Sequence, residues 1–541
     1  MSDVQIKLAS LVIAEHFGDV VENVCTYLLK YGSNSSRVVI AETKLRADQV
    51  KKALCVLVQH NIVTFAVSRR GLVEYTADIQ RALLLVRYAQ YIYCAKTLYG
   101  DVGELIIEEV LHHGQILMST VIEKVKEKLK EAMEGNQLDP SVIRDKFIEL
   151  VHTHFLQRLP ACSDPVDKAK GDDKTLPAIP QLKISDTELY TVPAHLHTEG
   201  FRKRKRSTGD VGKAEGSKRA RSSSTSSADG KELPPDDGIF WQVNFERFHR
   251  YFRDQDIISA ITQRIDKTAG EVVRTMLRIS ELTTDFMARS TKPLSSHEIS
   301  RQLPSECKLD HRRLEQYMKL LIDDQTMIVR KFSDAGGGTY DIDLEQASRI
   351  ICTANIESVV QERFGSKSYR IFKTLLMKKY LEQKEIENFA LIPAKEAKEL
   401  VYQMFSENFL SVQEIPRTPD HAPSRTIYLF TVSLCQVSHM LMERCYKSLI
   451  NTMLRRQYES AENRRLIEKE QRVEAITASL QGSGADPAQV EEIEKMMTPL
   501  EKQQLQKYKR RIAKLEQSEL QVDQTALVLN NFIMQEASGR S

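Results

Sequence analysis

One pattern recurs four times along this chain: a helical run of apolar residues leads directly into a strand-like run. The four passages lie at residues 48–63, 139–156, 310–329 and 394–410. The first two start 91 residues apart and the last two 84 residues apart. A period of this length indicates repeated domains, because solenoid repeats are much shorter.

A short hairpin is predicted after three of the four passages. Its turns fall at Ser68–Gly71, Gly336–Gly338 and Pro416–Pro423, each between two strand-like runs. Helices followed by a small hairpin within about 90 residues are typical of the winged helix, a helix-turn-helix with a β wing. Ser295–Glu298 has the pattern of a capping box that opens a helix of the third unit. No hairpin is evident after the second passage, so we expect that wing to be lost or absorbed into the next segment.

Residues 161–235 differ from the rest of the chain and predict a disordered linker. They hold six of the 16 prolines, six glycines and a Ser/Thr run at 222–227, without apolar periodicity. Residues 201–221 carry nine basic and two acidic groups, a net charge of +7, within a chain whose total is only +3. The remainder therefore sums to −4.

Two basic clusters about a dozen residues apart are typical of a bipartite nuclear-localisation signal. The alternatives are a solvated basic linker and a non-specific tether to nucleic acid. The candidate residues are Arg202, Lys203, Arg204, Lys205, Arg206, Lys218, Arg219 and Arg221.

The last hundred residues predict an antiparallel helical hairpin. Apolar residues keep a spacing of three, four or seven on both sides of a break at Gly482–Pro487, and Thr498–Glu501 fits a capping box with proline at the first helical position. We therefore expect a mainly α protein with small β wings. Its predicted parts are four tandem winged-helix domains at 1–80, 81–160, 236–346 and 347–435, the linker at 161–235 and a coiled-coil hairpin at 436–541.

A winged helix can bind DNA by placing its third helix in the major groove and its wing on the backbone. The basic residues at such positions, which would neutralise phosphates, are Lys51, Lys52, Arg69, Arg70, Arg312, Arg313, Arg330 and Lys331. Acidic residues flank several of them, and the chain outside the linker is net negative. We therefore expect few and local DNA contacts, with most units serving to dock other proteins.

Enzyme signatures are missing from the sequence. It has no Walker, dinucleotide-binding, zinc-protease or nucleophile-elbow motif, and none of its eight cysteines forms a C-x-x-C pair. We expect buried free thiols and assign no catalytic residue, no cofactor and no metal site; His152 and His154 lack further ligands at suitable spacing. Neither a secretory signal nor a membrane partner is expected, since no run approaches the ~18 apolar residues of a membrane span.

Several local motifs carry a resemblance to one family. They are Ile6–Leu8, Glu15–Gly18, Asp48–Asn61, Arg70–Tyr75, Arg87–Tyr88, Tyr91–Tyr93, Lys96–Tyr99 and Gly103–Ile106. These stretches resemble the RNA polymerase III-specific winged-helix subunit, the third-largest subunit of that enzyme and a relative of the alpha subunit of TFIIE. The layout of four units, the split after the second and the terminal hairpin are similar too.

The resemblance implies a non-catalytic, peripheral polymerase subunit in the nucleus. With two other polymerase III-specific subunits it would form a heterotrimer on the clamp of the largest subunit, touching promoter DNA weakly or indirectly. It would aid promoter opening and initiation on small-RNA genes such as those for tRNA and 5S rRNA, and take an indirect part in cytosolic DNA sensing in innate immunity. The competing hypotheses are a free-standing winged-helix transcription regulator and an enzyme of unrecognised type.

Overall fold

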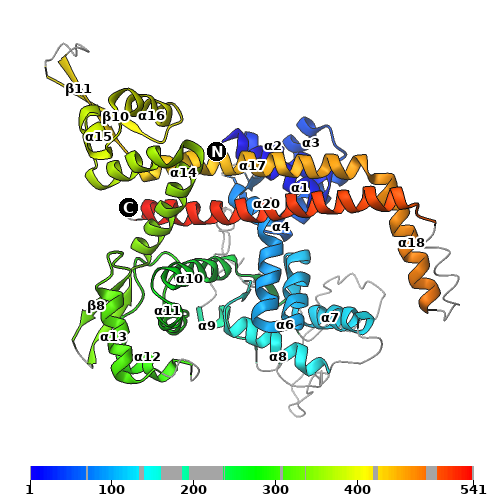
Figure 1. Cartoon of the computed structure of the whole chain (residues 1–541). Helices are drawn as coiled ribbons and strands as arrows, with labels where there is room; N and C mark the ends of the chain where they lie inside the picture. Colours follow the sequence, from blue (N-terminus) through cyan, green and yellow to red (C-terminus); the bar gives the residue numbers. More distant parts are fainter. Residues whose placement is uncertain are drawn as a thin grey trace, which may run out of the picture.

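The computed structural model shows a mainly helical protein in which small sheets surround a long pair of helices (Figure 1). The structure describes residues 2–68, 71–132, 139–159, 186–193, 196, 236, 238–304, 309–334, 337–417, 425–482 and 496–538. Within these residues, no helix is long and apolar enough to cross a membrane.

Four units of similar order fill most of the described chain, and we call them modules 1 to 4. Module 1 contains α2 (Asp19–Tyr31), β1 (Asn34–Ser35), α3 (Ser36–Thr43), α4 (Ala47–Gln59), β2 (Val63–Val67) and β3 (Val73–Ala77). Module 2 contains the second half of α6 (Tyr88–His113), β4 (Ile116–Leu117), α7 (Met118–Ala132), α8 (Pro140–His152), β5 (Leu156–Arg158) and β6 (Phe240–Val243).

The second pair of modules repeats this order. Module 3 contains α11 (Lys267–Ser280), β7 (Leu294–Ser295), α12 (Ser296–Gln302), α13 (His311–Ile322), β8 (Val329–Ser333) and β9 (Thr339–Ile342). Module 4 contains the second half of α14 (Leu344–Lys378), α15 (Gln383–Ala390), α16 (Ala394–Ser406), β10 (Ser411–Pro416) and β11 (Thr426–Thr431). The capping box predicted at Ser295 is present, since its side chain accepts from the Glu298 amide and Glu298 returns the bond.

The sheets of the first three modules share one topology. Their strand orders are β1-β3-β2, β4-β6-β5 and β7-β9-β8, with every pair antiparallel. In module 4, β10 pairs with β11, and an isolated bridge from Leu381 to Phe430 stands where the first short strand lies in the others. This shared order supports a common building plan for the four units.

The turn from the third helix into the wing contains a residue of the same left-handed backbone conformation in each module. Asn61, His154, Met327 and Asn408 all adopt positive φ, between 51° and 66°. Each donates its backbone N–H to the carbonyl three residues earlier, which satisfies a carbonyl at the helix end. A left-handed residue reverses the chain at once, so the strand begins two residues later in modules 1 to 3 and three residues later in module 4.

Module 2 corrects one expectation about its wing. The wing is present, because β5 pairs with β6 in the register Leu156↔Val243, and β6 follows the long linker in sequence. Trp241 of β6 is fully buried and packs edge-on against Phe147, with ring centroids 5.6 Å apart. The expected boundary at 235/236 is therefore wrong: residues 240–243 complete module 2 and do not open module 3.

The expected disorder of the whole 161–235 linker is also wrong for one piece of it. Residues 186–189 form the short helix α9, and Tyr190 stacks on His154 with ring centroids 3.7 Å apart. Val192 and Leu196 are buried in the core of module 2. The anchoring residues are few and widely spaced, so they leave no periodic signal in the sequence.

Long helices join the modules to one another. The first half of α10 (Phe245–Arg264) places Phe248 in the core of module 2, and its second half places Ile257 and Ile261 in the core of module 3. In α14, Leu344 lies in the core of module 3, whereas Phe372 lies beyond a kink at Gly365 in another core. The modules therefore share helices and are not separated by flexible joints there.

The predicted C-terminal hairpin is present, with one difference. Its first arm is α17 (Leu434–Glu462), and its second is the 40-residue α20 (Pro499–Ser538). A separate helix, α18 (Arg464–Gly482), turns away from the arms after Asn463 (Figure 1). The capping box at Thr498 and Glu501 is confirmed by reciprocal hydrogen bonds of 2.9 Å and 3.3 Å.

A single cluster of buried apolar residues joins module 1, module 4 and the hairpin. It includes Leu8 of α1 (Asp3–Phe17), Leu57 of α4, Phe372 of α14, Leu449 of α17 and Leu529 of α20. The hairpin therefore connects modules 1 and 4, because both modules share buried core residues with it. Between module 1 and α6, the chain continues through α5 (Ile79–Leu83) and the 3-10 turn η1 (Leu84–Arg87), whose residue Leu85 is buried in this same cluster.

Candidate docking and nucleic-acid interfaces

A buried ion pair holds the junction of modules 1 and 2 against the hairpin. Arg87 of η1 donates through Nε to both carboxylate oxygens of Asp523 in α20, at 3.0 Å and 2.8 Å. Burial opposes the charge of Arg87, but the adjacent Asp523 carboxylate outweighs burial and raises the pKa of the guanidinium. The pair orients the modules because neither charge is stable there without the other.

A second polar link fastens α1 to both arms of the hairpin. Arg456 of α17 donates to Glu15 of α1 at 2.7 Å and to Glu519 of α20 at 3.2 Å. Hydrogen bonding to Glu15 is the largest cause of the raised pKa of Arg456. Three elements far apart in sequence therefore meet at one guanidinium.

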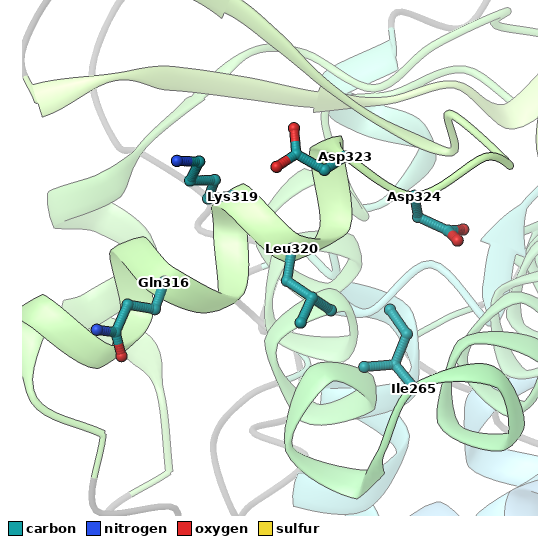
Figure 2. Close-up of a pocket in the computed structure, with 6 residues that line it drawn as sticks. All are labelled: Ile265, Gln316, Lys319, Leu320, Asp323 and Asp324. Carbon is teal, nitrogen blue, oxygen red and sulfur yellow. The ribbon is translucent and has the colours of Figure 1, made fainter.

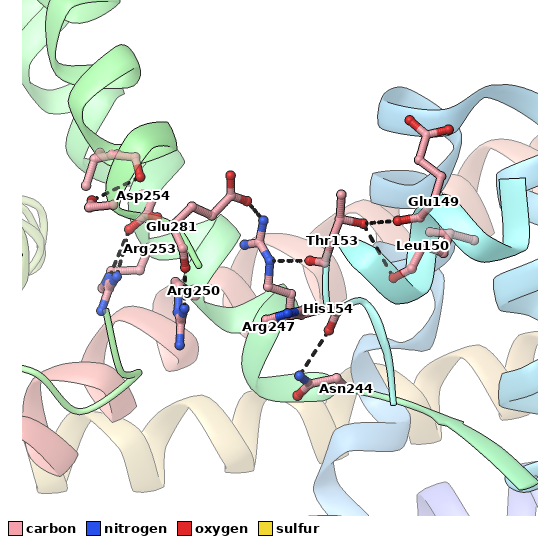
Figure 3. A network of polar contacts seen from close by, with 12 residues as sticks. Glu149, Leu150, Thr153, His154, Asn244, Arg247, Arg250, Arg253, Asp254 and Glu281 are labelled. Carbon is pink, nitrogen blue, oxygen red and sulfur yellow. Dashed lines mark hydrogen bonds and ion pairs between the residues drawn. The ribbon is translucent and has the colours of Figure 1, made fainter. Parts of the chain in front are cut away.

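A network of arginines connects modules 2 and 3 (Figure 3). Arg247 donates through Nε to the Thr153 carbonyl at 3.0 Å, forms an ion pair with Glu281 and lies over the Phe155 ring. Arg250 donates to the Glu281 carbonyl at 2.6 Å. Burial lowers the pKa of Arg247 to about 10, with a smaller effect from Arg250. These arginines stabilise the protein from within and are not free to neutralise phosphate.

The eight candidate DNA-contact residues separate into three groups. Lys51 and Lys52 are exposed on α4, and Arg312 and Arg313 are exposed on α13; none of the four has an acidic partner among the described residues. These pairs lie on the third helices of modules 1 and 3, as a DNA-facing role would require. One pair therefore belongs to module 1 and the other to module 3.

The wing candidates of module 3 are engaged by acids. Arg330 donates to Asp341 at 2.7 Å and to Asp343 at 2.8 Å, and Lys331 forms an ion pair with Asp334. Their charges are therefore partly neutralised before any DNA arrives. Arg69 and Arg70, and the nuclear-localisation candidates Arg202 to Arg206, Lys218, Arg219 and Arg221, lie outside the described residues.

Module 4 presents a different surface around its third helix. Tyr402 and Phe405 are exposed on α16, and Phe389 and Leu391 are exposed at the end of α15. Exposed aromatic and aliphatic side chains of this kind suit contact with protein more than contact with a phosphate backbone. The periodicity of α16 predicted the helix, but exposure of its apolar residues was not readable from the sequence.

A shallow hollow of about 450 Å³ lies between the end of α10 and α13 (Figure 2). Its lining residues are Ile265, Gln316, Lys319, Leu320, Asp323 and Asp324. Asp324 is held by Arg264 at 2.9 Å and by the Thr326 backbone amide at 3.3 Å. These bonds outweigh the effect of burial and lower the pKa of Asp324. Asp324 thus secures the turn that follows α13.

Two further observations concern metal binding and the cysteines. Among the described residues, no group of three or more His, Cys, Asp or Glu side chains could hold a metal ion. The cysteines differ from the expectation of uniform burial: Cys25, Cys94 and Cys352 are buried, whereas Cys55 is exposed on α4. Burial raises the pKa of the Cys25 and Cys94 thiols to about 12.

These features define a class of protein: a mainly helical chain in which helix-turn-helix and winged-helix units are mounted on a helical hairpin. Models of known families match the chain in four places. They are the RNA polymerase III subunit RPC82 helix-turn-helix domain at 7–68, RNA polymerase III subunit RPC82 at 145–351, the POLR3C C-terminal winged-helix domain at 356–432 and the RPC3 helical hairpin domain at 465–528.

Known relatives match nearly the whole chain. The proteins named DNA-directed RNA polymerase III subunit RPC3 from Bos taurus and Homo sapiens are each 50% identical over 98% of this chain and 99% of their own. The Dictyostelium discoideum protein of that name is 22% identical over 86% of this chain and 93% of its own. The chain belongs to the RPC3 family of RNA polymerase III subunits.

Proposed function

We propose that this protein is a non-catalytic scaffold that aids promoter opening and transcription initiation by RNA polymerase III on small-RNA genes, including those for tRNA and 5S rRNA. The observation that carries this proposal is the buried core shared by module 1, module 4 and the hairpin. A shared core fixes the spacing of the docking surfaces, so several partners can be held in one geometry. The Arg87–Asp523 pair and the links of Arg456 support the same role.

Membership of a polymerase III subunit family supports partners within that enzyme, and we propose which ones. They are two other polymerase III-specific subunits, which form a heterotrimer with this chain, and the clamp of the largest subunit. The exposed apolar side chains of α15 and α16 are suited to such protein contacts. The four modules are four winged helices, a count supported by their shared sheet order and by the left-handed residue before each wing.

Promoter DNA is contacted weakly, through Lys51 and Lys52 of α4 and Arg312 and Arg313 of α13. Their exposure, and the absence of an acidic partner for them among the described residues, support this assignment. Phosphate contacts of this number add to affinity without reading sequence. Arg330 and Lys331 contribute less, because aspartates already pair with them.

The protein acts in the nucleus, where the basic clusters of residues 201–221 serve as its import signal. Replacement of Arg202 through Arg206 by alanine should shift an isolated, tagged chain towards the cytoplasm, and unchanged nuclear accumulation would remove the assignment. A part in sensing cytosolic DNA would be indirect, through transcription of foreign DNA by the polymerase.

Affinity purification of the tagged full-length chain, followed by mass spectrometry, tests the proposed assembly. The expected result is recovery of the large polymerase III subunits together with two further subunits specific to that enzyme. Recovery of the chain without them, from cells in which polymerase III is intact, would overturn the proposal.

A further inference from the structure

A groove of about 1050 Å³ lies where four helices meet, outside the surfaces considered above. Its walls come from the first half of α6, α10 between modules 2 and 3, α14 and the hairpin helix α20. The side chain of Tyr93 on α6 is 71% exposed at its rim, so the groove is accessible to another molecule. The volume exceeds that of most small-molecule pockets.

Each wall contributes residues at helical spacing. On α10 the lining residues run from Phe252 through Asp256 to Gln263, and the other three helices likewise present side chains three or four positions apart. The α10 stripe alone is roughly 17 Å long at 1.5 Å per residue. Four helices that turn such stripes towards one space form a groove long enough to seat one face of a further helix over about three turns.

The lining of the groove carries a single acidic group. Asp256 is the one charged residue that lines it; the other polar members are amides, hydroxyls and a thiol. Asp256 has no hydrogen-bond or ion-pair partner among the described residues. Burial raises the pKa of its carboxyl to about 6, and no cation of the described chain opposes this shift. When this carboxyl is ionised, a positive group supplied by another molecule would stabilise it.

We propose that this groove binds an amphipathic helix of another protein, which inserts apolar side chains between α10 and α20 and pairs one lysine or arginine with Asp256. The apolar residues Phe252, Ile351 and Val528 supply the floor for such a helix. A nucleic acid does not suit the site, because Asp256, the one charged side chain among the described lining residues, would repel phosphate. The inference rests on the scaffold role above, since it names the chemistry of one docked partner.

A photo-crosslinking experiment tests the groove in the intact assembly. Tyr93 is replaced by benzoylphenylalanine in the tagged full-length chain, and crosslinked peptides from the purified complex are identified by mass spectrometry. The expected product joins Tyr93 to a segment of another protein that has apolar residues three or four apart and one basic residue. Asp256→Asn should lower the yield at least fivefold without changing the volume of the side chain.

Asp101→Asn is the matched control. It removes an acidic charge from α6, the helix that carries Tyr93, but the Asp101 side chain is 75% exposed and lies outside the groove lining. Its crosslink yield should equal that of the unaltered chain. Crosslinks to nucleic acid or to residues of the same chain, or an equal yield with Asp256→Asn, would overturn the proposal. The polymerase subunits that co-purify form a separate readout: their presence without the crosslink rejects the groove alone, and their absence rejects the scaffold role.

Discussion

Arg87 and Asp523 form an ion pair in the interior of the protein, in which the Nε–H of Arg87 is shared between both carboxylate oxygens, although the two residues lie 436 positions apart in the sequence. The pair joins the turn between modules 1 and 2 to the middle of the second hairpin arm. Tyr91 and Tyr446 lie close to it, so little water reaches either charge. A contact of this kind sets the orientation of the modules on the hairpin more sharply than apolar packing does, because an unpaired charge there is costly.

Removal of either partner should destabilise the protein strongly. We expect Arg87→Ala or Asp523→Ala to lower the free energy of unfolding by about 3–5 kcal/mol, since each leaves a buried charge unpaired. The double variant Arg87→Met with Asp523→Leu should recover much of that loss. Urea denaturation monitored by circular dichroism measures the free energy of unfolding of the two single variants and of the double variant.

A surface pair provides the control for this experiment. Lys447 and Glu443 form an exposed i,i+4 pair, and Lys447→Ala should change stability by less than about 0.5 kcal/mol. If the two single losses at Arg87 and Asp523 simply added in the double variant, the residues would not be acting as a pair.

Asp256 offers a test in which a loss of binding accompanies a gain in stability. Its pKa is raised from 3.8 to about 6 by burial, so folding favours the protonated form and stability falls as the pH rises through that interval. Asp256→Asn should therefore raise the free energy of unfolding at pH 7.5 by about 1–3 kcal/mol, with almost no effect at pH 4. Thermal denaturation of the variant and the unaltered chain at the two pH values measures this difference. Equal stability of the two proteins at pH 7.5 would contradict the account.

Acid should loosen the contact between modules 1 and 2 at His60. Its pKa is lowered from 6.5 to about 4, first by burial and then by His112, His113 and His16. The folded state thus binds fewer protons than the unfolded state between these values, and stability falls as the pH drops from 6.5 towards 4. The contribution of His60 to this loss should be about 2 kcal/mol at pH 5.

The variant His60→Leu isolates that contribution. Other histidines with lowered pKa values, among them His16 and His249, also titrate, so the informative quantity is the difference between the variant and the unaltered chain. Urea midpoints at pH 7 and pH 5 should lie closer together in the variant. An unchanged gap would show that His60 does not titrate in this way.

The DNA assignment makes a prediction about salt. The double variant Lys51→Ala and Lys52→Ala should weaken binding to a random duplex and reduce the slope of log K against log salt by about 1.8, as expected for two lost phosphate contacts. Arg330→Ala should change neither quantity appreciably, because Asp341 and Asp343 already neutralise that residue. Fluorescence anisotropy across a salt series measures both, and equal effects of the two variants would reject the assignment. Tight, sequence-specific binding by the isolated chain would favour a free-standing regulator.

Local patterns in the sequence predicted most of the fold because they depend on neighbouring residues. Helix periodicity located the modules, and the capping residues Ser295 and Thr498 marked helix starts that the structure contains. Prediction was poorer where the strands that pair lie far apart in the sequence. The strand that completes module 2 begins at Phe240, 84 residues after its partner strand begins at Leu156. A strand of four residues carries little signal alone.

The candidate sites were less accessible to prediction for the same reason. Lysines at 51 and 52 could be placed on a third helix from spacing, but the aspartates that engage Arg330 depended on strand register. The groove around Asp256 is built from four helices distant in sequence, so no single motif reports it. The left-handed turns were missed because Asn, His and Met occupy them and glycine does not.

Depletion and add-back in a transcription extract test the central claim most directly. Removal of this chain should abolish accurate initiation on a tRNA gene, whereas polymerisation from a tailed template that needs no promoter opening should persist. Adding back the purified assembly that contains the unaltered chain should restore initiation. Loss of polymerisation on the tailed template, or full initiation without this chain, would contradict its role as a non-catalytic initiation scaffold.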